Sequence, residues 1–289
     1  MKSKLEAGKF TVLAEIETPK GTDVSELVTN VTRIKGLVDG CIVPEMSSAV
    51  MSMSALGGAI LLQGIGMPVV MQINCRDRNR LALQADLLSA YACGVRGVMA
   101  VTGESTQIGD HPKAKEVYDI RLLELLQALM TLQNGKDMAG IELKGSPDFL
   151  VGTTINPGVP EDDLDREIVD LNQKRAAGAA FLVTPPVFDP ESLNRFLSRA
   201  EIDKSKILPT VLLLKSLGMA RYIDRNIEHI HLPQPLITRI QKAPDKEREC
   251  IRIAAETFQG IKDAGFGGVI LSTMGWERKI PQIFDVLRG

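Results

Sequence analysis

Two glutamates, Glu15 and Glu17, stand at the end of the short apolar run TVLAEI, which is stopped by Pro19 and Gly21. A carboxyl group enclosed by protein has a raised pKa and can act as a general acid near neutral pH. Two carboxylates held close together also resist double ionisation, which favours one of them remaining protonated. The stretch therefore predicts a proton donor, with a buried ion pair to Lys20 or Arg76 as the alternative.

These glutamates need a scaffold, and the spacing of apolar runs along the chain predicts one. Short β-branched or apolar runs recur at regular intervals, separated by segments with the apolar spacing of helices. Each connection is long enough for a helix, so the sheet should be parallel. We therefore predict a (β/α)8 TIM barrel that forms a single domain over residues 1–289. The eight runs are residues 11–16, 38–43, 68–74, 96–101, 149–155, 180–184, 207–214 and 267–272.

The segment DRNRLALQADLLSAYACG is predicted to be a helix with Asp77 as its N-cap and Gly94 at its C-terminal end. The arginines at its start are open to the alternative of a solvated helix end. Its predicted apolar stripe consists of Leu81, Leu83, Leu87, Leu88 and Ala92.

A second predicted helix begins in its first turn with Pro112, runs to about Leu132, and leaves Asp110 as a candidate N-cap. A third, DDLDREIVDLNQKRAAGA, ends at Gly178 and leads directly into the next strand. An open doubly wound sheet is the competing architecture. It would require a glycine-rich turn after the first strand, where the chain instead reads ETPKGTD.

Chemistry in such a barrel is placed at the C-terminal ends of the strands, where the loops converge. Side chains alternate along a strand, so Val12, Ala14 and Ile16 should face the surrounding helices. Glu15 and Glu17 should then both point into the barrel mouth.

Composition narrows the classes of partner. The formal net charge of -2 and a pI near 6.0 give no basic field for nucleic acid. No apolar stretch reaches the length of a membrane span, and the start lacks a secretory pattern, so we expect a soluble, cytoplasmic protein. The four cysteines lack ligand spacing, and the pair His229 and His231 has no third ligand in view, so no metal is predicted.

Along residues 8–288 the sequence resembles the methylenetetrahydrofolate reductase family. The stretches that carry the resemblance are EIETPKG, QINCRDRNRLALQADLLSA, VTGESTQIGDHPKAKEVYD, LVGTTINPG, KRAAGAAFLVTPPVFD and, more weakly, HLPQPLITRI. The resemblance implies a barrel that binds FAD and passes a hydride to 5,10-methylenetetrahydrofolate, giving 5-methyltetrahydrofolate. It implies NADH or NADPH as candidate electron donors, and methionine biosynthesis and one-carbon metabolism as the context.

The resemblance also implies roles for particular residues. The general acid that protonates the folate N10 falls on Glu15, and the aspartate that contacts the pterin falls on Glu104. Glu17, Asn74 and Thr184 are candidate substrate contacts. The implied flavin contacts are Gln72, Thr102, Gly103, Tyr118, Glu167 and Lys174.

The chain also departs from the family pattern. Pro185 replaces a pterin-binding glutamine, Pro44 and Glu45 replace a threonine and an aspartate after the second strand, and only 4% of residues are aromatic. These departures keep open an alternative: a folate-binding relative without its own flavin step, or a subunit of a larger electron-transfer complex. An iron–sulfur centre would then come from a partner subunit. A homo-oligomer is the default expectation for the family.

Overall fold

The computed structural model describes residues 1–228 and 230–289. Eight strands form a closed parallel barrel in which each strand pairs with the next and β8 pairs with β1. The predicted (β/α)8 barrel and all eight of its strands are confirmed. The strands are β1 (Thr11–Glu15), β2 (Gly40–Val43), β3 (Val69–Asn74), β4 (Gly97–Val101), β5 (Leu150–Thr154), β6 (Phe181–Pro186), β7 (Ile207–Leu212) and β8 (Gly268–Ser272).

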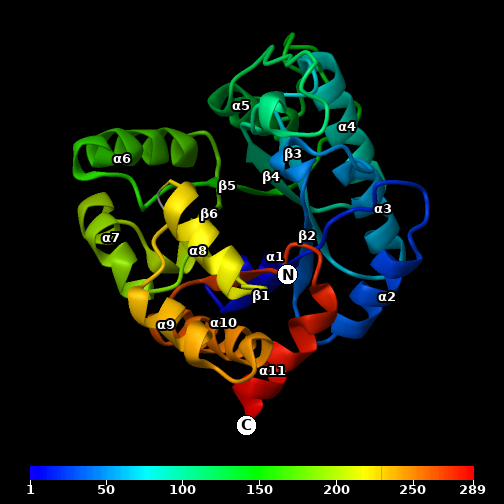
Figure 1. Ribbon diagram of the computed structural model, residues 1–289. Helices are drawn as coiled ribbons and strands as arrows, with labels where there is room; N and C mark the ends of the chain where they lie inside the picture. The colour runs from blue at the N-terminus through cyan, green and yellow to red at the C-terminus, as the bar shows by residue number, and fades with distance from the viewer. Residues whose placement is uncertain (229) are drawn as a thin grey trace.

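Helices surround the strands, while α1 lies near the middle of this ring (Figure 1). Within the described part of the chain, no helix combines the length and apolarity needed to cross a membrane. The helices are α1 (Lys2–Glu6), α2 (Ser25–Ile34), α3 (Ala55–Gly64), α4 (Arg80–Ala92), α5 (Leu122–Gln133), α6 (Glu161–Ala176), α7 (Asn194–Ala200), α8 (Leu217–Asn226), α9 (Gln234–Lys242), α10 (Lys246–Asp263) and α11 (Ile280–Arg288).

The barrel interior is a packed apolar core to which every strand contributes a side chain. Leu5 of α1 and Met1 close its N-terminal end. Space is tight, because a Cβ atom at Gly152 would lie 2.1 Å from the Phe181 ring. The strand residues of this core are Leu13, Ile42, Val70, Met99, Leu150, Phe181, Val183, Leu208 and Ile270.

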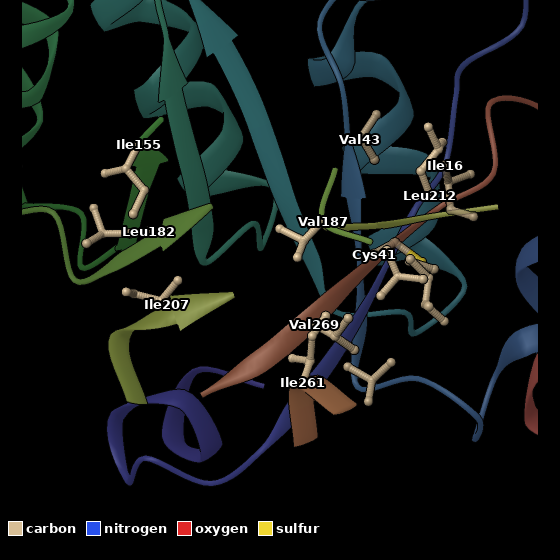
Figure 2. Packing of buried hydrophobic residues seen from close by; sticks show 14 of the residues in the cluster. Ile16, Cys41, Val43, Ile155, Leu182, Val187, Ile207, Leu212, Ile261 and Val269 are labelled. Atoms are coloured by element: carbon tan, nitrogen blue, oxygen red, sulfur yellow. The ribbon is translucent and has the colours of Figure 1, made fainter. Parts of the chain in front are cut away.

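A second apolar layer lies between the strands and the helices, and Figure 2 shows part of it. Val12, Ala14 and Ile16 belong to this outer layer, whereas Leu13 belongs to the interior. The predicted alternation along β1 is therefore confirmed, and it directs Glu15 into the barrel mouth.

The start of α4 differs from the prediction. Asn79, not Asp77, is the N-cap: its Oδ1 accepts hydrogen bonds from the backbone N–H groups of Leu81 and Ala82, both at 3.1 Å. Asp77 is instead held by Arg76, which is 2% exposed and so is not a solvated helix start. The buried stripe is narrower than predicted and consists of Leu83, Leu87 and Ala90.

Leu81 and Leu88 are exposed, the former at 74%. Gly94, with φ 94°, follows the helix in the left-handed conformation, as the predicted helix end requires.

The predicted helix from Pro112 was wrong in its start, since α5 begins only at Leu122. Residues 111–121 are held outside a helix because their carboxylates bind other segments. Glu116 accepts from the backbone N–H of Thr106 at 2.7 Å, and Asp119 accepts from that of Arg80 at 2.9 Å. Asp110 is likewise not an N-cap. The third predicted helix is confirmed as α6.

Candidate active site

A cavity of about 1040 Å³ opens at the C-terminal ends of the strands. Its volume is at the upper end of the range of about 300–1,000 Å³ typical of small-molecule sites. Most of the residues predicted for the site line this cavity. They are Glu15, Glu17, Gln72, Thr102, Gly103, Glu104, Glu167, Lys174 and Thr184.

Glu15 lies at the end of β1, with part of its surface open to the cavity. The hydroxyl of Ser272, at the end of β8, donates a 2.6 Å hydrogen bond to its Oε1. Burial raises the pKa of Glu15, and the neighbouring charges of Glu17 and Glu277 raise it further, while the Ser272 hydrogen bond lowers it. The net direction is upward, as a proton donor requires.

The alternative of an ion pair for Glu15 is wrong. Among the described residues, Lys20 pairs with Asp110 and Arg76 pairs with Asp77. Glu15 is therefore a half-buried carboxyl group that has no cationic partner among the residues the structure describes.

Glu277 is a second buried carboxyl group near this site, and sequence reasoning missed it. It starts η5 (Glu277–Lys279), and the amide of Asn30 on α2 donates to its Oε2 at 3.4 Å. Burial raises its pKa, and the charge of Glu17 adds to that effect. No local sequence signal marks it, because only barrel closure brings the segment after β8 beside the end of β1.

Glu104 follows β4 and is exposed at the cavity wall. Its Oε2 accepts a 2.6 Å hydrogen bond from the backbone N–H of Ser48 in the loop after β2. That loop contains left-handed residues with a side chain at Met46 (φ 50°), Ser48 (φ 53°) and Ala49 (φ 54°), a conformation that costs free energy. Glu104 thus helps to hold a strained loop against the site.

Asp110 adds a second connection among these loops. It accepts from the backbone N–H of Met51 at 3.0 Å and binds Lys20 and His111. Hydrogen bonds from the Lys20 ammonium and the His111 ring hold the pKa of Asp110 well below its usual range. The loops after β1, β2 and β4 therefore meet at one carboxylate.

Two predicted site residues do not line the cavity. Asn74 is fully buried, and its side-chain amide donates to Asp77 Oδ2 at 2.9 Å. Tyr118 lies on the loop after β4, and its hydroxyl donates to the backbone oxygen of Gly103 at 3.1 Å. Neither residue is part of the cavity lining, although Tyr118 holds Gly103, which is.

The opposite side of the cavity carries a buried cation. Lys174 of α6 is 7% exposed; its Nζ donates to the backbone oxygen of Thr154 at 2.9 Å and lies 2.5 Å from Asp170. Glu167 lies about two turns before Lys174 on α6 and accepts a hydrogen bond from the backbone N–H of Asn156 at 2.7 Å. Lys174 could contribute to holding a phosphate group only by sharing its charge with Asp170, to which it is already paired.

Pro44 and Pro185, which replace polar residues of the family pattern, face the cavity, and Pro186 lies beside them. The cavity is also lined by residues 46–48 and 50–52 of the loop after β2, which sequence reasoning did not identify. Gln72 is partly engaged, because its Oε1 accepts from the backbone N–H of Glu45 at 2.9 Å.

The histidine pair gives no metal site in the described part of the chain. His231 is 84% exposed and lies 3.9 Å from Asp224, and His229 lies outside the described residues. Among the described residues, no group of three or more His, Cys, Asp or Glu side chains is placed so that it could hold a metal ion.

Known proteins share the fold. A protein from Clostridium thermocellum, described as binding two copies of 5-methyl-5,6,7,8-tetrahydrofolic acid, matches with a TM-score of 0.68 and 14% identity, covering 99% of this chain and 97% of that one. EDTA monooxygenase from Chelativorans sp. BNC1 matches with a TM-score of 0.60 and 11% identity, covering 96% and 93%. At these identities the likeness shows the fold alone.

Sequence comparison is more specific. Methylenetetrahydrofolate reductase 2 of Schizosaccharomyces pombe is 24% identical over 187 residues, which cover 62% of this chain and 28% of that protein. The chain thus matches just over a quarter of the length of this relative. The family model for methylenetetrahydrofolate reductase matches residues 1–288, so the chain belongs to the methylenetetrahydrofolate reductase family.

Proposed function

We propose that this chain reduces 5,10-methylenetetrahydrofolate to 5-methyltetrahydrofolate with FAD as its cofactor and Glu15 as the general acid. One observation carries the proposal: Glu15, half-buried at the C-terminal end of β1, lines a large cavity and has a pKa raised by its surroundings. Membership of the family supports the reaction class. The fold-level neighbour described as binding 5-methyltetrahydrofolate supports a folate as the small-molecule ligand.

Bound FAD would supply the hydride, and the residues of this chain would supply the proton and the binding geometry. Glu15, whose pKa is raised by burial, would transfer its proton to N10 of the folate, opening the five-membered ring to an electrophilic iminium. Ser272 holds the Glu15 carboxyl group in one orientation through the 2.6 Å hydrogen bond. A carboxyl group that is already held in one orientation loses less entropy when it reaches the reactive geometry.

The proposed contacts divide the cavity into two ends. Gln72, Thr102 and Gly103 would hold the flavin ring near Glu15, and Lys174 with Glu167 would hold the phosphate and ribose end. Glu104 would contact the pterin, and its hydrogen bond to the Ser48 N–H is then shared with or exchanged for the substrate.

The electron donor is a separate part of the proposal. NADH and NADPH are both compatible with it, and a protein partner carrying an iron–sulfur centre is the third option. The four cysteines of the chain are dispersed, so such a centre would belong to that partner.

A second function is a folate-binding relative without its own flavin step. It is favoured by the cavity lining, in which Pro44 and Pro185 take the positions of polar residues in the family pattern and no described residue is aromatic. A flavin or pterin ring would then have no aromatic side chain to stack on.

Titration of the purified protein with FAD, followed by visible absorbance and by flavin content after desalting, separates the two functions. The reductase proposal expects one retained FAD per chain. Calorimetric titration with 5-methyltetrahydrofolate is run in parallel. A colourless protein that takes up no FAD but binds the folate would reject the reductase and support the second function.

A further inference from the structure

Arg76, directly after β3, is a buried cation that the proposed reaction does not use. It is 2% exposed and does not line the cavity. Its guanidinium makes a two-pronged contact with Asp77, from Nε to Oδ1 at 2.7 Å and from Nη2 to Oδ2 at 2.8 Å. Burial alone would raise the pKa of Asp77, but hydrogen bonds from Arg76 and Asn74 outweigh it and hold that pKa below its usual range. The pair is therefore charged and fixed.

The third nitrogen of the guanidinium binds the turn that follows the neighbouring strand, β4. Nη1 of Arg76 donates to the backbone oxygen of Glu104 at 2.8 Å. The oxygen of the preceding residue, Gly103, accepts from the Tyr118 hydroxyl at 3.1 Å. Two consecutive carbonyl groups of the turn after β4 are thus held by side chains that do not line the cavity.

The turn also packs directly on Arg76. Gly103 has φ 90°, and a Cβ atom there would lie 2.9 Å from the Cβ of Arg76. Gly103 therefore lets the backbone approach Arg76 closely in a left-handed conformation that other residues rarely adopt. A shift of the guanidinium would displace the turn, and with it the side chain of Glu104.

We propose that Arg76 is a positioning residue that sets where the Glu104 carboxylate lies in the cavity, through its hydrogen bond to the Glu104 backbone. The inference rests on the proposed role of Glu104 toward the substrate. Lysine cannot replace arginine here, because one ammonium group cannot make both the two-pronged contact with Asp77 and the bond to the Glu104 oxygen. Asn74 supports this arrangement indirectly, because its side-chain amide donates a hydrogen bond to Asp77, the partner of Arg76.

A double-mutant cycle with Arg76→Lys and Glu104→Gln tests this coupling. Both single variants and the double variant are loaded with FAD, and kcat and KM are measured with 5,10-methylenetetrahydrofolate. Affinity for 5-methyltetrahydrofolate is measured by calorimetry on the same proteins. We expect Arg76→Lys to lower kcat/KM by about 10- to 100-fold, the scale of a small misplacement in an active site. The double variant should lose little more than Glu104→Gln alone.

Arg80→Lys is the matched control. Arg80 makes a similar two-pronged contact with Asp119, from Nε to Oδ2 at 2.9 Å and from Nη2 to Oδ1 at 3.2 Å, but the pair is partly exposed and does not touch Glu104. Its kcat/KM should change by less than about twofold, the scale of a surface pair.

Two results would overturn the inference. One is an Arg76→Lys loss that multiplies with that of Glu104→Gln, as a general loss of folded protein would. The other is an Arg76→Lys variant as active as Arg80→Lys. If thermal unfolding shows that Arg76→Lys does not fold, Asp77→Asn enters the same cycle with the same two criteria. A wild-type chain that binds neither FAD nor folate would instead reject the proposed function.

Discussion

Glu15 and Glu17 are two residues apart, but their surroundings differ. Glu15 is enclosed by protein and bonded to Ser272, whereas Glu17 is exposed at the rim of the cavity. Alternation along β1 predicted from the sequence that both would face the mouth. It could not predict the enclosure, because Ser272 and Glu277 come from the other end of the chain. The chemistry proposed for Glu15 depends on these distant neighbours.

The raised pKa of Glu15 has a consequence for stability. In the unfolded chain its carboxyl group titrates near the ordinary value of 4.5, and in the folded chain it titrates at higher pH. The folded state therefore binds this proton more tightly than the unfolded chain does. The stabilisation that results is fully present below pH 4.5 and is lost as the pH rises through the folded pKa. Each pKa unit of that difference corresponds to about 1.4 kcal/mol.

Glu15→Gln should accordingly raise the free energy of unfolding at pH 8, and the gain should disappear at pH 4. Urea unfolding at both pH values measures it. Glu17→Gln, at an exposed position of the same segment, is the control and should change stability less. An equal effect of Glu15→Gln at the two pH values would show that the carboxyl group is not perturbed by burial.

At the scale of elements, strands were easier to predict than helix starts. A strand that is buried on both faces appears as a short continuous apolar run, and β3 and β7 are recognisable in this way. Helix starts depend on which polar side chain finds a backbone N–H. Asn79, not Asp77, is the N-cap of α4, and the Asp77 carboxylate is instead bound by Arg76. Residues 111–121 were predicted to be helical but are not, because Glu116 and Asp119 bind backbone N–H groups of other segments. The spacing of residues in the sequence carries no sign of those contacts.

The packing of β5 against β6 can be tested at Gly152. A Cβ atom there would lie 2.1 Å from Phe181, so Gly152→Ala should destabilise the barrel by about 1–3 kcal/mol, as overpacked core substitutions do. Gly64→Ala is the matched control, since it lies in helix α3 with no heavy atom within 4 Å of the added methyl group. It should be neutral or stabilise by up to about 1 kcal/mol. Urea unfolding measures the free energy of unfolding of both variants. Equal changes in that free energy would show that the barrel interior is not tightly packed at Gly152.

At the scale of the whole molecule, the barrel explains why residues distant in sequence form one cavity. Glu15, Glu104, Lys174 and Ser272 each follow or flank a different strand, and barrel closure brings them to the same end. The regular spacing of eight apolar runs was enough to predict that end as the site. It was not enough to show that Asn74 and Tyr118 do not line the cavity, because their side-chain directions depend on tertiary contacts, Asn74 with Asp77 and Tyr118 with Gly103.

The central claim is that Glu15 donates the proton that lets reduced flavin reduce the folate. The most direct measurement is anaerobic stopped-flow absorbance of the FAD-loaded protein, reduced chemically so that the natural electron donor is not needed, and mixed with 5,10-methylenetetrahydrofolate. The wild-type flavin should be reoxidised. In Glu15→Gln, reoxidation should be slower by about 10²- to 10⁴-fold, the usual contribution of a general acid, while 5-methyltetrahydrofolate still binds. Reoxidation of Glu15→Gln at the wild-type rate would contradict that claim.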